Sequence, residues 1–361
     1  MKKRVLHLSK FYLPRLGGIE TAVRNIVEEE SDEYEHVVLT NSNKSFHRFI
    51  NKVSVIEKKS LTIFSQPLSL TYIIWYLKNY RNFDIIHLHL PNYLSCLVVY
   101  LFPPQKLIVH WHATIEAVPT KKALFPLNLL ELKIINRANK IIVGTEKYAS
   151  SSVNLSKYKN KLVYIYYGCD SQLLPNIEKQ NIFVSVGRLV PYKGLVELVT
   201  NIIIPDGWIW YIIGDGPLYL TLKGVIESRK LSNQIIVKNK VDNEELKSIY
   251  SQSRIFLFPS LTSQESFGIS QIEAMSAGNI VFNFNIPNSG VSQIIENEYD
   301  GINFELQDYN GLNTSLNELC ADLTKLSIMS KNAIQSYHSK FTKSVFANSV
   351  LETYSSIFLE Q

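Results

Sequence analysis

The chain has 361 residues, of which 46% are hydrophobic and 19% charged, a composition typical of a globular protein with two or three domains. Disordered chains, collagens and disulfide scaffolds are excluded. The 37 Lys and Arg against 32 Asp and Glu leave a net charge of only +5, which makes nucleic acid an improbable main partner. Residues 1–175 hold 23 basic and 13 acidic side chains and the remainder hold 14 and 19, so the two halves carry opposite charge.

The cysteines and the apolar runs bear on the cellular location. Cys96, Cys169 and Cys320 are far apart, with neither a CxxC spacing nor an even number for disulfides, which favours the reducing cytoplasm. The basic start lacks the apolar core of a signal peptide. The longest apolar run, residues 93–102, is about half of the ~20 residues that a bilayer span needs. We therefore expect no segment that crosses a membrane.

Short runs rich in Val, Ile and Leu predict the strands. The first set lies at residues 4–8, 36–40, 84–90, 106–112, 140–145 and 161–168. After a polar stretch at 170–180, a second set lies at residues 181–189, 208–216, 234–241, 254–260 and 279–285. Because the runs are continuously apolar and are separated by helix-length segments, they predict parallel sheets buried on both faces. The fold class is α/β, with two Rossmann-like, doubly wound domains facing a cleft.

The domain boundaries follow from this division. We expect a first domain at 1–172 and a second at 173–341, with the only hinge candidate in the polar stretch between the two strand sets. The apolar spacing of 342–361 predicts an amphipathic helix that packs back on the first domain. In open α/β sheets, ligands bind outside the carboxyl ends of the strands, so chemistry is expected in the loops that follow them.

Two glycine-containing loops are candidates for binding phosphate. Gly17 and Gly18 follow the first strand and enter a helix, where backbone N–H groups can approach an anion, although an ordinary turn is an equal alternative. The segment VGRLVPYKG, which contains Gly187, follows the first strand of the second set. Its Arg188 and Lys193 can converge on one diphosphate, and their position at a strand end favours this over ordinary surface exposure.

A third loop carries two carboxylates. A strand ends at Pro259, and a helix is expected from about Phe267 to Gly278. Glu265 lies just ahead of this helix and Glu273 about two turns inside it, which suits two hydroxyl-bearing groups of one ligand, with phosphate at the helix N-terminus. The alternative is a helix-capping Glu265 and a solvated Glu273.

Histidines form the remaining constellation. His87 and His89 share one face of a strand, as do His110 and His112. A metal site is disfavoured because no cysteine or third-ligand motif accompanies the pairs. We interpret His87 and His110 as hydrogen-bonded core residues, whereas His112 ends its strand at the cleft.

These motifs occur together in a known order. PRLGGIET, IYYGCD, GRLVPYKG, IIGDGP and ESFGISQIEAMSAG, spread from residue 14 onward, resemble the retaining GT-B glycosyltransferases of family 4, which use nucleotide diphospho-sugars. The later NIPNSGVSQIIENEYDG, which ends at residue 301, is similar to members that build bacterial surface polysaccharides such as O-antigen. The resemblance implies a GT-B fold and a hexosyltransferase without cofactor or catalytic metal.

The resemblance also implies roles for single residues. Arg188 and Lys193 would bind the donor diphosphate, and Glu265 would bind hydroxyls of the donor sugar. His112 would reach the transferred sugar, and Glu273 would bind the nucleotide ribose. Further donor-binding positions are Gly17, Gly18, Gly187, Phe267, Gly268 and Ile269. Asn239 departs from the glycine that the family often has where the base packs, so the base stays open between GDP- and UDP-sugars.

The acceptor is expected on the basic first half. Residues 121–133, with the aromatic segment 72–80, would place cations and apolar groups against an anionic membrane surface, and an ordinary buried helix is an equal alternative. The membrane interpretation predicts a lipid-linked diphosphate oligosaccharide as acceptor and a peripheral location on the inner face of the cytoplasmic membrane. Alternatives to the transferase are a non-catalytic sugar-nucleotide-binding scaffold, an epimerase or a phosphorylase on the same fold.

Overall fold

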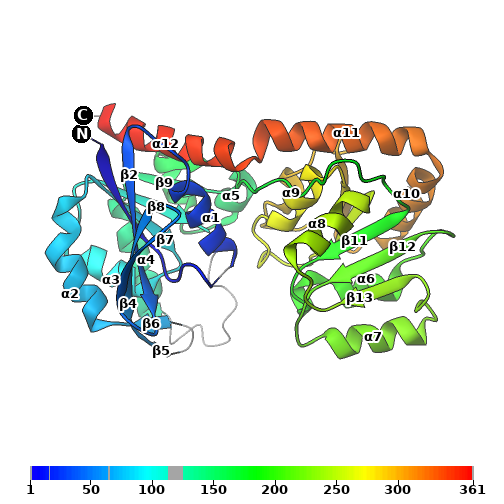
Figure 1. Ribbon diagram of the computed structural model, residues 1–361, viewed down its shortest axis with the longest axis horizontal. Coiled ribbons are helices and arrows are strands. Elements are labelled where there is room, and N and C mark those ends of the chain that lie inside the picture. The colour runs from blue at the N-terminus through cyan, green and yellow to red at the C-terminus, as the bar shows by residue number, and fades with distance from the viewer. Residues whose placement is uncertain (1, 16, 64–65, 113–124, 360–361) are drawn as a thin grey trace. The chain divides into compact units, whose positions relative to one another are not determined.

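The computed structural model describes residues 2–15, 17–63, 66–112 and 125–359. In the last of these ranges, side chains are described from Leu129 onward. The chain divides into two compact units, Met1–Gly168 with Lys343–Gln361, and Cys169–Thr342. The boundaries predicted from the sequence, 172/173 and 341/342, lie within a few residues of the observed ones, 168/169 and 342/343. Each unit has its own sheet and its own covering helices (Figure 1).

The first unit is built on an eight-stranded sheet with the order β10-β9-β8-β7-β1-β2-β4-β3, parallel except for the β3–β4 pair. Its strands are β1 Lys3–Leu8, β2 Tyr34–Ser42, β3 Phe46–Ile50, β4 Val53–Lys59, β7 Ile85–Leu90, β8 Leu107–Trp111, β9 Lys140–Val143 and β10 Leu162–Tyr164, and a separate hairpin joins β5 Leu61–Ile63 to β6 Gln66–Leu68. The chain winds outward from β1 to β4 and then returns to β7, so the switch point of the winding lies between β1 and β7.

Among the described residues, six α-helices cover this sheet: α1 Gly18–Val27, α2 Leu70–Asn79, α3 Tyr93–Leu101, α4 Phe125–Arg137, α5 Glu146–Ser151 and α12 Lys343–Leu359. Buried residues of α2, α3, α4 and α5 form one large apolar cluster with one face of the sheet. Helices α1 and α12 pack against each other and lie on the opposite face, where the apolar cluster is smaller. In Figure 1 the red α12 lies against the first unit, although it is the last helix of the chain.

The second unit is a six-stranded parallel sheet with the order β13-β12-β11-β14-β15-β16. Its strands are β11 Ile182–Val186, β12 Ile209–Ile213, β13 Ile235–Lys238, β14 Ile255–Phe258, β15 Ile280–Asn285 and β16 Gly301–Glu305. Its helices are α6 Leu195–Asn201, α7 Tyr219–Ser228, α8 Asn243–Gln252, α9 Ile269–Ser276, α10 Tyr309–Ala321 and α11 Leu323–Lys340. This is the strand order of a dinucleotide-binding Rossmann fold, and its switch point lies between β11 and β14.

The strands that the sequence analysis expects are present, but it missed five others. Strands β3 to β6 are short or antiparallel, and β3 exposes Phe46 and Phe49, so these segments lack the continuous apolar pattern of a buried parallel strand. Strand β16 is missed because only Gly301 and Phe304 of its five residues are buried. The apolar pattern therefore identified most of the parallel strands, including the edge strands β10 and β13, and missed the short, antiparallel or partly exposed ones.

The membrane surface predicted from the sequence consists of two segments, residues 72–80 and 121–133, and the structure describes the first fully and the second only in part. Tyr72 and Tyr76 of α2 are completely buried and hydrogen-bond to Ser95 and to the carbonyl of Phe102, so they are core residues. Residues 121–124 lie outside the described residues. Within the described ranges, no helix is both long enough and apolar enough to cross a bilayer.

Candidate active site

The site expected from the sequence lies in the second unit, at the switch point of its sheet. Strands β11 and β14 are parallel neighbours, so the loops that follow them leave the same edge. The first loop carries Arg188 and Lys193, and the second carries Glu265. The amide of Leu261 donates to the carbonyl of Tyr192 over 2.8 Å, which ties the two loops together.

Lys193 and Glu265 meet directly. The Lys193 ammonium forms an ion pair with the Glu265 carboxylate, and the two side chains are only 13% and 14% exposed. The same ammonium lies 4.9 Å from the centre of the Phe258 ring, within the range of a cation–π contact. Residues 72 positions apart thus form one charged pair that is largely shielded from solvent.

Two glycines allow close packing against the end of β14 and the loop that follows it. Gly194 has a φ of +66°, and a Cβ there would lie 2.0 Å from the carbonyl oxygen of Pro259. Gly268 has a φ of +82°, and its Cβ would lie 2.7 Å from the Phe258 ring. A side chain at either position would strain the backbone, and it would displace the opposite loop at Gly194 and the Phe258 ring of β14 at Gly268.

Arg188 lies apart from the ion pair. Its side chain is exposed and donates to the hydroxyl of Tyr192 over 3.1 Å. Gly187 is closer, because a Cβ there would lie 3.5 Å from Cε of Lys193. The exposed guanidinium keeps further donors for an anion.

Helix α9 carries the second carboxylate. It begins at Ile269, directly after buried Phe267 and Gly268, so Glu273 lies about one turn inside it and not two. The Glu273 Oε2 atom accepts a hydrogen bond of 3.3 Å from the hydroxyl of Tyr250, which is fully buried on α8. Glu273 is thus a half-buried, hydrogen-bonded carboxylate and not a solvated surface residue.

Electrostatics connect Glu273 to the ion pair. Burial raises the pKa of the Glu273 carboxyl, and the Tyr250 hydrogen bond and the charge of Lys193 act in the opposite direction. Lys193 therefore interacts with both glutamates of the predicted set. Tyr250 was not identified from the sequence, because nothing in its local pattern distinguishes it from an ordinary buried helix residue.

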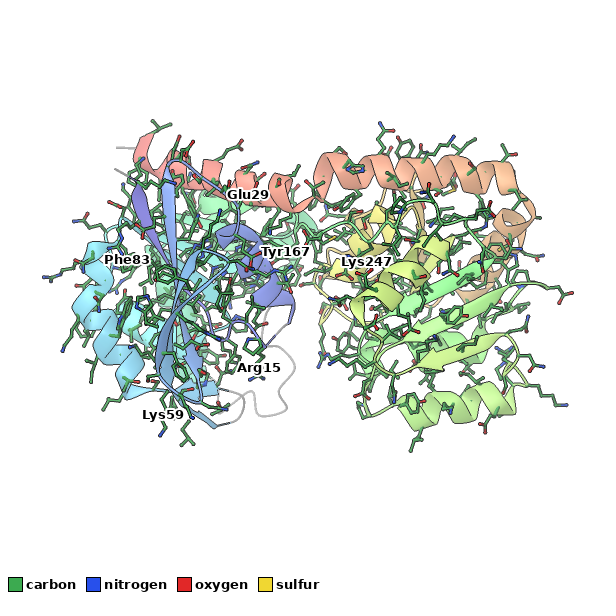
Figure 2. All side chains as sticks on the ribbon, in the orientation of Figure 1. Arg15, Glu29, Lys59, Phe83, Tyr167 and Lys247 are labelled. Atoms are coloured by element: carbon green, nitrogen blue, oxygen red, sulfur yellow. The ribbon has the colours of Figure 1, made fainter. Side chains whose placement is uncertain are left out.

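Three predicted site residues lie in the first unit. Gly17 and Gly18 start α1 and are exposed, and the carboxylate of Glu20 occupies the space beside Gly17. His112 directly follows β8 and is only 6% exposed. Its Nδ1 atom is 2.8 Å from the hydroxyl of Tyr167, labelled in Figure 2, and its Nε2 atom is 3.0 Å from Nδ1 of His89, so both ring nitrogens have protein partners.

The other histidines differ from the expectation in number and in bonding. His7 and His36, which the sequence analysis did not select, join the two pairs in one buried group. His87 is a hydrogen-bonded core residue, as expected. His110 is buried, but neither of its ring nitrogens has a hydrogen-bond partner among the residues that the structure describes, so the expectation of a hydrogen bond was wrong.

These histidines also supply a third candidate metal ligand, which the sequence pattern lacked. Ring nitrogens of His7, His87 and His89 lie within 4.8 Å of one another, and so do those of His89, His110 and His112. The sequence could not reveal this because His7 comes from β1, some 80 residues before β7, and only strand pairing brings them together.

Comparisons with known proteins agree with this architecture. The family model for group 1 glycosyltransferases matches residues 170–336, and the model for glycosyltransferase family 4 matches residues 16–173. An O-antigen chain mannosyltransferase of Escherichia coli is 24% identical over 98% of both chains, and a D-rhamnosyltransferase of Pseudomonas aeruginosa is 25% identical over 76% of both.

Solved structures share the fold. A sucrose-phosphate synthase of Thermosynechococcus elongatus superimposes with a TM-score of 0.78 over 100% of both chains at 17% identity. The Anabaena protein HepE in complex with UDP gives a TM-score of 0.76 over 99% of this chain and 100% of that one, also at 17% identity. The two family models and these folds agree, and the chain belongs to the family 4 glycosyltransferases with the GT-B fold.

Proposed function

We propose that this glycosyltransferase moves a hexose from a nucleotide diphospho-sugar to a hydroxyl of a glycan acceptor, with retention at the anomeric carbon, in the synthesis of O-antigen or a related surface polysaccharide. The buried Lys193–Glu265 ion pair at the β11/β14 switch point is the observation that carries the proposal. The name of the E. coli relative supports the O-antigen class, that of the P. aeruginosa relative supports sugar transfer, and the UDP complex of HepE supports a nucleotide donor.

The proposed donor site uses the charges of the second unit. An ammonium has three N–H donors, so Lys193 can bind a phosphate oxygen while it keeps Glu265. Arg188 adds a planar fork, and the first amides of α9 add the positive end of a helix dipole. Glu265 is left to accept from hydroxyls of the sugar, and Glu273 from hydroxyls of the ribose.

This arrangement supports a mechanism without a protein nucleophile. As the bond between the sugar and the diphosphate breaks, negative charge develops on the leaving oxygens, where Arg188, Lys193 and the α9 amides stabilise it. The leaving phosphate then accepts the proton of the acceptor hydroxyl on the same face of the sugar, which retains the anomeric configuration. No metal is required, because the cationic side chains and helix amides supply the charge stabilisation.

The acceptor is proposed to be a lipid-linked diphosphate oligosaccharide at the inner face of the cytoplasmic membrane. The excess of basic side chains in the first 175 residues supports attraction to anionic lipid. Co-sedimentation with vesicles tests this, and we expect binding to anionic but not to neutral vesicles. Equal binding to both, or to neither, contradicts the membrane proposal and leaves the transferase proposal standing.

A thermal-shift screen tests the donor. The melting temperature is measured with GDP, UDP, dTDP and ADP and with their common sugars, because a ligand that binds only the native state raises it. We expect one nucleotide, GDP or UDP, to shift the melting temperature, and Glu273→Ala to abolish the shift. Glu244→Ala is the control, since Glu244 lies in the same unit with a side chain that is 77% exposed. A shift that persists in Glu273→Ala contradicts the assignment of the ribose contact.

Product analysis tests the reaction itself. The anomeric configuration of product and donor, compared by NMR coupling constants, should be the same. An inverted product contradicts retention, and a free sugar, a sugar phosphate or an isomeric sugar nucleotide formed without acceptor supports a phosphorylase or epimerase instead.

A further inference from the structure

One face of the first unit's sheet carries six buried histidines, each no more than 8% exposed. They are His7 on β1, His36 on β2, His87 and His89 on β7, His110 on β8 and His112 directly after it. In the strand register His7 lies opposite His87, and His89 lies opposite His110, so the alternation of a strand puts these rings on one face. The group surrounds the switch point between β1 and β7.

Three of these rings, His7, His87 and His89, form a triad whose ring nitrogens lie within 4.8 Å of one another. Each ring has one nitrogen that is hydrogen-bonded to a partner outside this triad. His7 Nε2 is 2.9 Å from Nδ1 of His36, and His87 Nδ1 is 2.6 Å from the hydroxyl of Tyr354 on α12. His89 Nδ1 is 3.0 Å from Nε2 of His112. Such outer hydrogen bonds fix the ring orientation and tautomer of histidines that bind metal ions.

The second nitrogen of each ring is available as a ligand atom for a metal ion. His7 Nδ1 and His89 Nε2 hydrogen-bond to each other over 3.1 Å, and a bound ion would replace the proton that they share. Two nitrogens bound at about 2.0–2.1 Å to one tetrahedral ion lie roughly 3.3–3.4 Å apart, so this pair already has nearly the required spacing. His87 Nε2 is buried and has no hydrogen-bond partner among the described residues, which is costly for a polar atom unless something else binds it.

We propose that His7, His87 and His89 form a binding site for one late first-row divalent cation, with Zn²⁺ as the expected ion. Imidazole suits Zn²⁺, Cu²⁺, Ni²⁺ and Co²⁺, whereas Mg²⁺ and Ca²⁺ need oxygen ligands, and no carboxylate belongs to either histidine triad. His110, whose nitrogens have no hydrogen-bond partner among the described residues, is a candidate fourth ligand, because its ring centre is 5.5 Å from those of His87 and His89.

The second triad is the weaker alternative. His110 lacks, among the described residues, the outer hydrogen bond that would orient it, whereas each ring of the first triad has one. The two triads share His89, so one ion in the first triad uses the ring that the second would need.

The ion would link β1 to β7 beneath α12 and take no part in sugar transfer. The proposal therefore does not rest on the proposed function, and either can fail without the other.

Metal analysis of the tag-free, full-length protein tests the site. The protein is treated with a chelator and titrated with Zn²⁺ and with Co²⁺, whose visible absorption reports tetrahedral nitrogen coordination. We expect one equivalent per chain and a higher melting temperature with Zn²⁺. A folded wild-type protein that binds neither ion overturns the proposal, and so does one that binds only ions removed by a brief wash.

Variants locate the ion. His87→Gln should abolish stoichiometric binding, whereas His47→Gln, which changes an exposed histidine outside the group, should leave it unchanged. Tyr354→Phe keeps all three ligands and removes only the outer hydrogen bond to His87, so we expect it to weaken binding about 10- to 100-fold. This variant decides the question if His87→Gln does not fold. Unchanged affinity in Tyr354→Phe or in folded His87→Gln overturns the assignment.

Discussion

In the first unit the buried histidines at the switch point lie within the strands, whereas in the second unit the charged side chains at the switch point lie just after them. Strands β11 and β14 contribute apolar residues to their core, and charged Lys193 and Glu265 appear only in the following loops. Strands β1 and β7 instead place His7, His87 and His89 inside the sheet face. The winding is the same in both units, but the position of the polar groups along the strand differs.

The difference has an energetic meaning. A polar group beyond a strand end can be satisfied by water, by a ligand or by helix amides, so it is available for function. A polar group inside a strand has no access to water and must be satisfied by its neighbours or by a bound ion. Substitutions in the second unit's loops should therefore change activity, and substitutions in the first unit's sheet should change stability.

The largest expected effect is on catalysis. Lys193→Ala removes the shielded cation from the donor site, and we expect kcat/KM to fall by about 30- to 1,000-fold, or about 2–4 kcal/mol in the barrier. Lys247→Ala is the matched control, because this lysine of α8 pairs only with the exposed Glu244 in the described ion pairs (Figure 2). If Lys193→Ala turns over at the wild-type rate, the role of the ion pair is wrong.

A pH effect is expected on the apolar face of the first unit. Burial raises the pKa of Glu131 on α4 to about 7, above its ordinary value of 4.5. Because the folded-state pKa is the higher one, the stabilisation by protonated Glu131 is complete below about pH 4.5 and is lost as the pH rises through 7. The loss amounts to at most about 3 kcal/mol.

Glu131→Gln stays neutral and isolates this effect. We expect the free energy of unfolding of the variant, relative to wild type, to increase by up to about 3 kcal/mol between pH 4.5 and 8. Urea denaturation at both pH values measures it. A difference between variant and wild type that does not change with pH means that Glu131 is ionised in the folded protein without cost.

Two histidine variants of the first unit's sheet test the expectation that substitutions there change stability. Both are measured in chelator-treated protein. His87→Leu leaves the buried hydroxyl of Tyr354 without its hydrogen bond and should cost about 1–3 kcal/mol of unfolding free energy. His110→Leu removes two nitrogens that have no partners among the described residues, so it should be neutral or stabilising. Denaturant titrations compare them, and an equal loss in both variants would show that the hydrogen bonds do not distinguish these positions.

The smallest effect concerns a positioning residue. Tyr250→Phe removes the hydrogen bond to Glu273, and we expect donor binding to weaken by about 0.5–1.5 kcal/mol, with KM raised more than kcat is lowered. The pKa of Glu273 should rise, because the lost bond favours the ionised form. In a Glu273→Gln background, Tyr250→Phe should have no further effect. Additive losses in the double variant would mean that Tyr250 acts on the donor by another route.

Amino-acid patterns along the chain are enough to assign the α/β class, most of the parallel strands and the loops that carry the candidate site. Continuous apolar runs identify strands that are buried on both faces, and the motifs around Lys193, Glu265 and Glu273 lie after them in the described elements. Local patterns suffice here because each motif is one strand end followed by one helix start. Edge strands such as β3 were missed because their exposed faces lack that pattern.

Only the tertiary structure decided which distant residues meet. The Lys193–Glu265 ion pair, the Tyr250–Glu273 hydrogen bond and the His7–His89 contact each join different elements, so they depend on strand order and register. The sequence showed two separate histidine pairs, and the pairing of β1 with β7 and of β7 with β8 made them one buried group. A pattern along the chain records the period of an element, but the contacts between elements are set by how those elements pack.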